Sequence, residues 1–94
     1  PAMSDSSPFK AILITGASSG IGEELAVQLA ASGAHLTLTA RRRELLDALA
    51  GRVSTAGHET PVVVPADVTR DGDLEHAVNE AVRAYGKLDI VIAN

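Results

Sequence analysis

Hydrophobic positions along this 94-residue chain switch regularly between two spacings. Short runs of consecutive or alternating apolar residues, typical of strands, are separated by longer stretches in which apolar residues recur every three or four positions, typical of helices. The strand-like segments are residues 11–14, 34–40, 61–65 and 88–92. The pattern β-α-β-α-β-α-β predicts an α/β fold of the Rossmann type, an incomplete doubly wound parallel sheet with right-handed crossovers and strand order 3-2-1-4.

Each helix-like stretch carries an apolar stripe and stops at a glycine. In the first stretch Ile21, Leu25 and Leu29 recur every fourth residue, with Ala26 and Ala30 beside them. The second and third helices are expected over about residues 43–56 and 71–85. Glycine is the residue most often found just after a helix end, and it stands at all three expected ends, Gly33, Gly57 and Gly86.

The segment TGASSGIG, residues 15–22, joins the first strand to the first helix. Its glycines let the backbone turn sharply, approach a phosphate closely and begin a helix whose N-terminus favours negative charge. Three glycines at this spacing arise by chance in about 3 in 100 chains of this length, so the flanking strand and helix are needed for the inference. Their order predicts a dinucleotide site, whereas a P-loop is excluded because no lysine follows the last glycine.

Composition and charge limit the possible functions. The chain is 46% hydrophobic with one Phe, one Tyr and no Trp, so its core is expected to consist of Val, Ile, Leu and Ala. A net charge of −4 argues against nucleic-acid binding. Without cysteine, and with N-terminal apolar runs too short for a signal or a membrane span, we expect a soluble, cytoplasmic protein. The histidines show no metal-ligand spacing, so no metal site is expected.

Three motifs in register resemble the short-chain dehydrogenase/reductase family. They are Gly16-x-x-x-Gly20-x-Gly22 after Thr15, the segment Ala66-Asp67-Val68 after the third strand, and residues 88–94. The resemblance covers residues 10–94, and the glycine spacing is similar to the classical branch of the family. In one departure, Ala93 stands where the family usually has the first Asn of Asn-Asn-Ala-Gly, so Asn94 would be the second.

The resemblance implies a role in dinucleotide binding for each matching residue. Backbone amides and serine hydroxyls of the glycine turn would line the adenosine ribose and the pyrophosphate. The residues concerned are Gly16, Ser18, Ser19, Gly20, Ile21 and Gly22. Asp67 and Val68 would hold the adenine, with the carboxylate accepting from its amino group, and Asn94 would shape the sheet end beside the cofactor. Two plainer alternatives stay open, in which Ser18 and Ser19 are helix caps and Asp67 is a turn carboxylate.

The end of the second strand indicates which dinucleotide is preferred. In such folds an acidic residue about 20 residues beyond the glycine turn bonds the ribose 2′-hydroxyl, whereas an arginine accommodates a 2′-phosphate. Here Arg41, Arg42 and Arg43 stand at that place, and residues 34–43 contain no carboxylate. We therefore expect NADP(H) rather than NAD(H), with Arg41 as the main contact and Arg42 as a weaker one. The alternative is a solvated run of charges paired with acidic residues farther along, Glu44 and Asp47.

Catalysis is not carried by these residues. The family uses a Ser and a Tyr-x-x-x-Lys pair, and neither lies within the chain; its single tyrosine, Tyr85, falls on the apolar face of the third helix and is expected in the core. The resemblance implies the cofactor-binding half of an NADP(H)-dependent oxidoreductase acting on a small carbonyl or alcohol substrate, in a protein that forms homo-oligomers. The alternative is a catalytically silent dinucleotide-binding or interaction module.

The two ends of the chain suggest a domain division. Pro1-Ala2 before Met3 looks like a cloning remnant, and residues 4–8 read as a polar, flexible lead. Residues 9–94 would then be the N-terminal portion of a Rossmann dinucleotide-binding domain. Because the chain stops inside an apolar strand, which would leave a hydrophobic sheet edge uncovered, we expect a longer chain or a partner that covers this strand.

Overall fold

A computed structural model describes residues 8–94, and within this range strands and helices alternate as the hydrophobic pattern predicts. The elements are β1 (Ala11–Thr15), α1 (Gly20–Ala31), β2 (His35–Ala40), α2 (Arg43–Thr55), β3 (Val62–Pro65), α3 (Asp73–Tyr85) and β4 (Ile90–Ile92). The strands form one parallel sheet in the order β3-β2-β1-β4, which confirms the predicted order 3-2-1-4. Residues 1–7 of the expected lead lie outside the described range.

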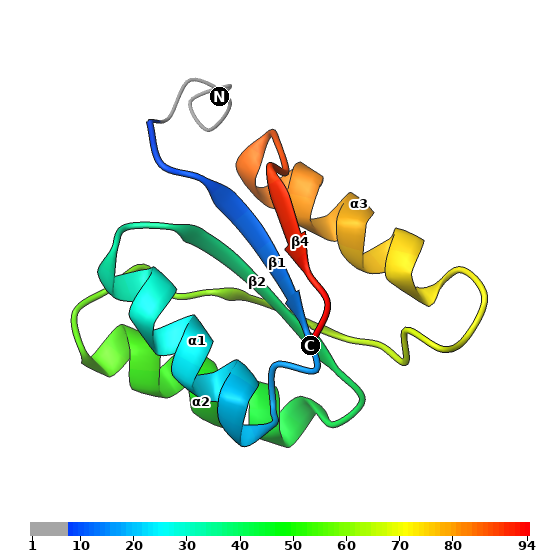
Figure 1. The fold of residues 1–94 in the computed structure, drawn as a ribbon, viewed down its shortest axis with the longest axis horizontal. Helices are drawn as coiled ribbons and strands as arrows, with labels where there is room; N and C mark the ends of the chain where they lie inside the picture. The colour runs from blue at the N-terminus through cyan, green and yellow to red at the C-terminus, as the bar shows by residue number, and fades with distance from the viewer. Residues whose placement is uncertain (1–7) are drawn as a thin grey trace.

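The sheet is covered on both faces (Figure 1). Helices α1 and α2 pack on one face, and α3 packs on the other. Under α1 and α2 the core is made by side chains of β1, β2 and α2, namely Ile12, Ile14, Leu36, Leu38, Leu46, Leu49 and Val53. Under α3 a smaller cluster contains Leu13, Val64 and Ala77. None of the helices within residues 8–94 combines the length and the apolar character needed to cross a bilayer.

Helix α1 packs on the sheet mainly through its small residues, and of its large apolar stripe Leu25 and Leu29 pack at the edge of the core while Ile21 does not. Ile21 is 77% exposed, and the residues buried against the sheet are the small ones, Gly22, Ala26 and Ala30. Small side chains let the helix backbone approach the strands closely. A Cβ at position 22 would lie 2.6 Å from the Gly16 carbonyl oxygen, which leaves no room for a larger residue. The expected stripe is therefore wrong for Ile21.

Strand β2 is buried throughout its centre, although its sequence alternates between leucine and threonine. Thr37 and Thr39 are both 0% exposed and pair in register with strand residues on the face that α3 covers. Thr39 Oγ1 donates to the Val64 carbonyl oxygen at 2.6 Å. Thr37 Oγ1 is buried without a hydrogen-bond partner among the described residues. The alternation of leucine and threonine thus indicated strand β2 correctly, but it did not indicate that β2 is buried on both faces.

Two elements start two residues later than expected. Helix α3 begins at Asp73 because Gly72, with φ of 87°, occupies the left-handed region just before it. Strand β4 begins at Ile90 because Asp89 pairs with Ala11 at the entrance to the sheet. The Asp89 amide donates to the Ala11 carbonyl oxygen at 2.9 Å, and the Asp89 carboxylate accepts from the Ala11 amide at 2.8 Å.

Candidate functional site

A cavity of about 430 Å³ opens where the carboxyl ends of the parallel strands meet. This edge of an open α/β sheet, outside the strand ends, is where such folds bind ligands. Three segments far apart in the sequence surround the cavity: the glycine turn after β1, the end of β2, and the loop after β3. Its lining residues are Thr15, Gly16, Ser18, Ser19, Thr39, Ala40, Arg41, Arg42, Ala66, Asp67, Val68, Thr69 and Asn94.

The glycine turn leaves one side of the backbone open. Gly16 has φ of 61°, and a Cβ there would lie 2.8 Å from the Asn94 carbonyl oxygen, so both backbone conformation and space exclude a larger residue. At Gly20 an added Cβ would meet nothing within 4 Å. The first of these glycines therefore serves the turn itself, and Gly20 leaves space at the start of α1 for a close approach from outside.

The two serines of the turn differ in their contacts. Ser19 is the N-cap of α1, and its Oγ accepts from the Gly22 amide at 3.2 Å, which confirms the capping alternative for this residue. Ser18 lines the cavity, and its hydroxyl has no hydrogen-bond partner within the described range. Ser18 is therefore the serine whose hydroxyl stays available to a ligand.

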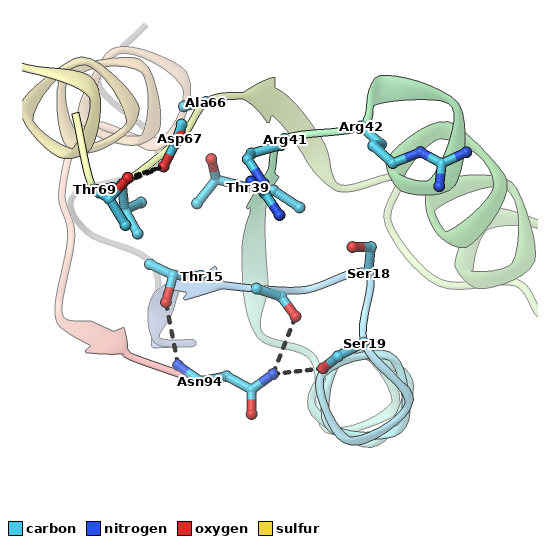
Figure 2. A pocket seen from close by; sticks show the side chains of 13 residues that line it. Thr15, Ser18, Ser19, Thr39, Arg41, Arg42, Ala66, Asp67, Thr69 and Asn94 are labelled. Atoms are coloured by element: carbon cyan, nitrogen blue, oxygen red, sulfur yellow. Dashed lines mark hydrogen bonds between the residues drawn. The ribbon is translucent and has the colours of Figure 1, made fainter.

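Asn94 fastens the end of β4 to the glycine turn (Figure 2). Its amide N donates to Thr15 Oγ1 at 3.1 Å, and its side-chain Nδ2 donates to the Gly16 carbonyl oxygen at 3.0 Å and to Ser19 Oγ at 2.7 Å. These bonds join two segments that are more than 70 positions apart in the chain. Asn94 thus supports the shape of the turn from the side, at the rim of the cavity.

The structure separates the three consecutive arginines. Arg42 Nε lies 2.9 Å from Glu44 Oε2, and Arg43 Nη1 lies 3.7 Å from Asp47 Oδ1. In Figure 2 the Arg42 side chain extends away from the centre of the pocket, whereas Arg41 lies in the middle of the view. Among residues 8–94 no carboxylate forms a salt bridge with Arg41. The expected pairing with acidic residues therefore holds for Arg42 and Arg43 only.

Asp67 is held in place by its own loop. Its carboxylate accepts from the Thr69 amide at 2.9 Å and from the Thr69 hydroxyl. These two bonds, together with the positive charges of Arg41 and Arg70, hold the pKa of Asp67 below its ordinary value. The side chain is consequently ionised at neutral pH and stands at the cavity wall as an acceptor.

Some expected site residues do not line the cavity. Gly22 lies beneath the turn, where its amide completes the N-cap. Gly20 and Ile21 lie beside the cavity, along a shallow hollow on the outer side of α1. Conversely, sequence reasoning missed Thr39 and Thr69. Thr69 carried a signal, since Asp followed two residues later by Thr is a recurring turn pattern in which the carboxylate bonds the following backbone.

Tyr85 lies at the opposite end of the sheet from the cavity. Its side chain is 7% exposed, its hydroxyl donates to the Leu36 carbonyl oxygen at 2.8 Å, and its ring stacks on His35 at 5.1 Å between centroids. Burial raises the pKa of Tyr85 to about 12, so the phenol stays neutral. The expectation that Tyr85 belongs to the core is confirmed.

Solved structures with a similar fold include one apo enzyme and two complexes with nicotinamide cofactors. The apo-form glucose dehydrogenase of Caenorhabditis elegans is 36% identical with a TM-score of 0.87, covering 94% of this chain and 39% of that one. A 3-ketoacyl-(acyl-carrier-protein) reductase from Brucella melitensis complexed with NADH is 34% identical with a TM-score of 0.78, covering 87% and 32%. A metagenomic short-chain oxidoreductase in complex with NADP is 30% identical with a TM-score of 0.80, covering 87% and 37%.

Comparison of sequences gives the same result. An 11-beta-hydroxysteroid dehydrogenase-like 3 from Arabidopsis thaliana is 44% identical over 85 residues. The match covers 90% of this chain and 28% of the relative, so the chain spans about a quarter of the length of that protein. The family model of the short chain dehydrogenases matches residues 10–94, which include the glycine turn, the Asp67 loop and Asn94, and the chain therefore belongs to the short-chain dehydrogenase family.

Proposed function

We propose that this chain is the dinucleotide-binding part of an oxidoreductase that uses NADP(H) in preference to NAD(H). The reaction would be hydride transfer between the nicotinamide and a small carbonyl or alcohol substrate. The observation that carries the preference is the place of Arg41, which lies in the cavity at the end of β2 without a carboxylate paired to it among the described residues. Structural relatives include complexes with NADH and with NADP, so the preference rests on this chain's own residues.

Charge at the end of β2 favours a 2′-phosphate. A guanidinium can bond a phosphate through two parallel N–H groups, which makes arginine well suited to this recognition. Helix α2 also begins beside the cavity without a side-chain cap, because its N-cap is Arg42. Because the Glu44 carboxylate engages its own amide, only the other amides of the first turn would add hydrogen-bond donors for an anion.

The remaining contacts fit the other parts of a dinucleotide. The Ser18 hydroxyl and the start of α1 would bind the pyrophosphate, with Gly20 leaving space for its approach. The Asp67 carboxylate and the Val68 side chain would bind the adenine. When bound, the nicotinamide supplies the hydride chemistry, and the residues of this chain bind and orient it.

The proposal is tested by measuring the dissociation constants of NADPH and NADH in the intact protein that carries this chain. In the Arg41→Ala variant, NADPH binding should weaken by about 10- to 100-fold, the size of a lost charge-assisted hydrogen bond, whereas NADH binding should change less than about 3-fold. Arg43→Ala is the matched control, because Arg43 pairs with Asp47 outside the cavity. Equal losses for both cofactors in Arg41→Ala would overturn the preference for NADP(H).

A further inference from the structure

The loop that carries Asp67 is tied to helix α3 by a second aspartate. The Asp67 amide donates to Asp73 Oδ2 at 2.9 Å, across six positions of the chain. The loop between them is closed by two backbone bonds, from the Arg70 amide to the Asp67 carbonyl oxygen at 2.9 Å and from the Asp73 amide to the Arg70 carbonyl oxygen at 3.2 Å. Asp73 does not line the main cavity; it lines a neighbouring hollow together with Asp67 and Arg70.

The direction of this carboxylate is unusual for its position. An acidic residue in the first turn of a helix commonly interacts with the free amides of that same turn. Here the N-cap of α3 is Gly72, which has no side chain to offer, yet Asp73 Oδ2 bonds the amide of the loop. The bond therefore fixes the path of the loop.

Two residues thus hold Asp67 by hydrogen bonds to different parts of it. Thr69 holds the carboxylate through its amide and hydroxyl, and Asp73 holds the backbone through the Asp67 amide. A bond between a carboxylate and an amide is stronger than one between neutral groups. Without the Asp73 carboxylate, the Asp67 amide would lose its acceptor, and the loop would be held to α3 only by the backbone bonds through Arg70. The Asp67 carboxylate would then be held less firmly at the cavity wall.

We propose that Asp73 is a positioning residue for the adenine half of the cofactor and acts through Asp67. This rests on the proposed function, in which Asp67 contacts the adenine. Asp73 does not line the main cavity, so its effect would pass through Asp67. The consequence is that its removal weakens binding of any ligand that contains the adenosine half, whether or not a 2′-phosphate is present.

A role confined to starting α3 would give a different result. Such a role would lower the midpoint of unfolding without affecting ligand binding selectively. A positioning role would weaken the binding of 5′-AMP, which contains the adenosine half alone, and the effect would vanish once Asp67 has lost its carboxylate. A double-mutant cycle between positions 67 and 73 measures this dependence directly.

The test uses the intact protein and 5′-AMP as the probe. Asp73→Ala should weaken 5′-AMP binding by about 5- to 10-fold, and Asp73→Asn, which keeps an acceptor oxygen at the same reach, by less than about 2-fold. In an Asp67→Ala background, Asp73→Ala should have no additional effect. Asp71→Ala is the matched control, because Asp71 is an exposed acid in the same loop and makes no side-chain hydrogen bond within residues 8–94. Should Asp73→Ala fail to fold, Asp73→Ser serves instead, because its hydroxyl suits a helix start but ends one bond short of the aspartate oxygen.

The outcomes separate this inference from the proposed function. Unchanged 5′-AMP binding in Asp73→Ala, or an equal loss in the Asp67→Ala background, overturns the positioning role while leaving the dinucleotide site intact. Failure of the wild-type protein to bind 5′-AMP overturns the dinucleotide site and the inference together. Loss of the NADPH preference does not bear on this test, since 5′-AMP carries no 2′-phosphate.

Discussion

The side-chain Nδ2 of Asn94 lies 2.7 Å from Ser19 Oγ, and this hydrogen bond joins the end of β4 to the N-cap residue of α1. Ser19 Oγ receives a second hydrogen bond from the Gly22 amide at 3.2 Å. One hydroxyl thus links a strand end and a helix start that lie on opposite sides of the glycine turn (Figure 2). The turn keeps its shape through contacts from both elements.

Replacement of Asn94 by alanine removes both side-chain hydrogen bonds to the turn. We expect the free energy of unfolding to fall by about 1 kcal/mol, because the bonds are exposed, and NADPH and NADH binding to weaken equally. Equal weakening distinguishes this change from Arg41→Ala. Asn79→Ala, at an exposed position of α3, is the control, and denaturant titration with cofactor binding checks both effects. A selective loss of NADPH alone would contradict this account.

The glycines at positions 20 and 22 should respond differently to alanine. At Gly22 the new Cβ would lie 2.6 Å from the Gly16 carbonyl oxygen and 2.9 Å from Asn94 Nδ2, so the helix must shift and the protein should lose about 1–3 kcal/mol of stability. At Gly20 the new methyl group meets open space, so folding should be unaffected while cofactor binding weakens. Thermal unfolding and cofactor titration of the two variants separate the roles. Equal destabilisation of both would show that the open side of Gly20 is not what the structure indicates.

The order of elements could be predicted because each depends on local periodicity. The alternation of strands and helices followed from the spacing of apolar residues and glycines, and the strand order followed from the general topology of doubly wound sheets. The buried face of α1 could not be predicted from residue size, since close packing against a sheet selects Ala26 and Ala30 over the larger Ile21. Hydrophobic periodicity indicates a helix more reliably than it indicates how closely that helix approaches the sheet.

The site was predictable only in part, for a similar reason. The sequence ranked Arg41 above Arg42, but it could not show that Arg42 and Arg43 pair with Glu44 and Asp47 while Arg41 lines the cavity without such a pair among residues 8–94. The bond from Asp67 to Asp73 depends on the path of the intervening loop, which no periodicity describes. Contacts set by loop geometry therefore had to come from the structure.

Replacing the two buried threonines of β2 by valine should change the free energy of unfolding in opposite directions. Thr37 Oγ1 has no partner among the described residues, so Thr37→Val removes an unpaired buried hydroxyl and should stabilise the protein by about 1 kcal/mol. Thr39 Oγ1 donates to the Val64 carbonyl oxygen, so Thr39→Val should destabilise it by about 1 kcal/mol. Urea titration of both variants checks the pair. A loss of stability in Thr37→Val would mean that the Thr37 hydroxyl is hydrogen-bonded in solution.

Removal of the Tyr85 hydroxyl should affect stability and not ligand binding. Tyr85→Phe leaves the Leu36 carbonyl oxygen without its side-chain donor and should cost about 1 kcal/mol of unfolding free energy. The stacked ring against His35 is retained, so the protein should still fold. The dissociation constant of NADPH should stay unchanged, because Leu36 lies near the start of β2 and the cavity lies at its end. A weaker NADPH affinity in this variant would argue against a purely structural Tyr85.

Asp89 should make the protein less stable in acid. The hydrogen bond from the Ala11 amide, supported by Lys87 at 3.4 Å, holds the pKa of Asp89 below its ordinary value. A carboxyl whose pKa is lowered by folding stabilises the folded state above its unfolded pKa, near about 4, and this contribution is lost as the pH falls through the lower folded value. Urea midpoints of the wild type should therefore drop below about pH 4.

In Asp89→Asn the drop should be shallower but not absent, because the pKa of Asp67 is also lowered. Asp71→Asn, at an exposed position, should keep the wild-type slope. An unchanged slope in Asp89→Asn would show that the bond to Ala11 does not depend on the charge of the carboxylate.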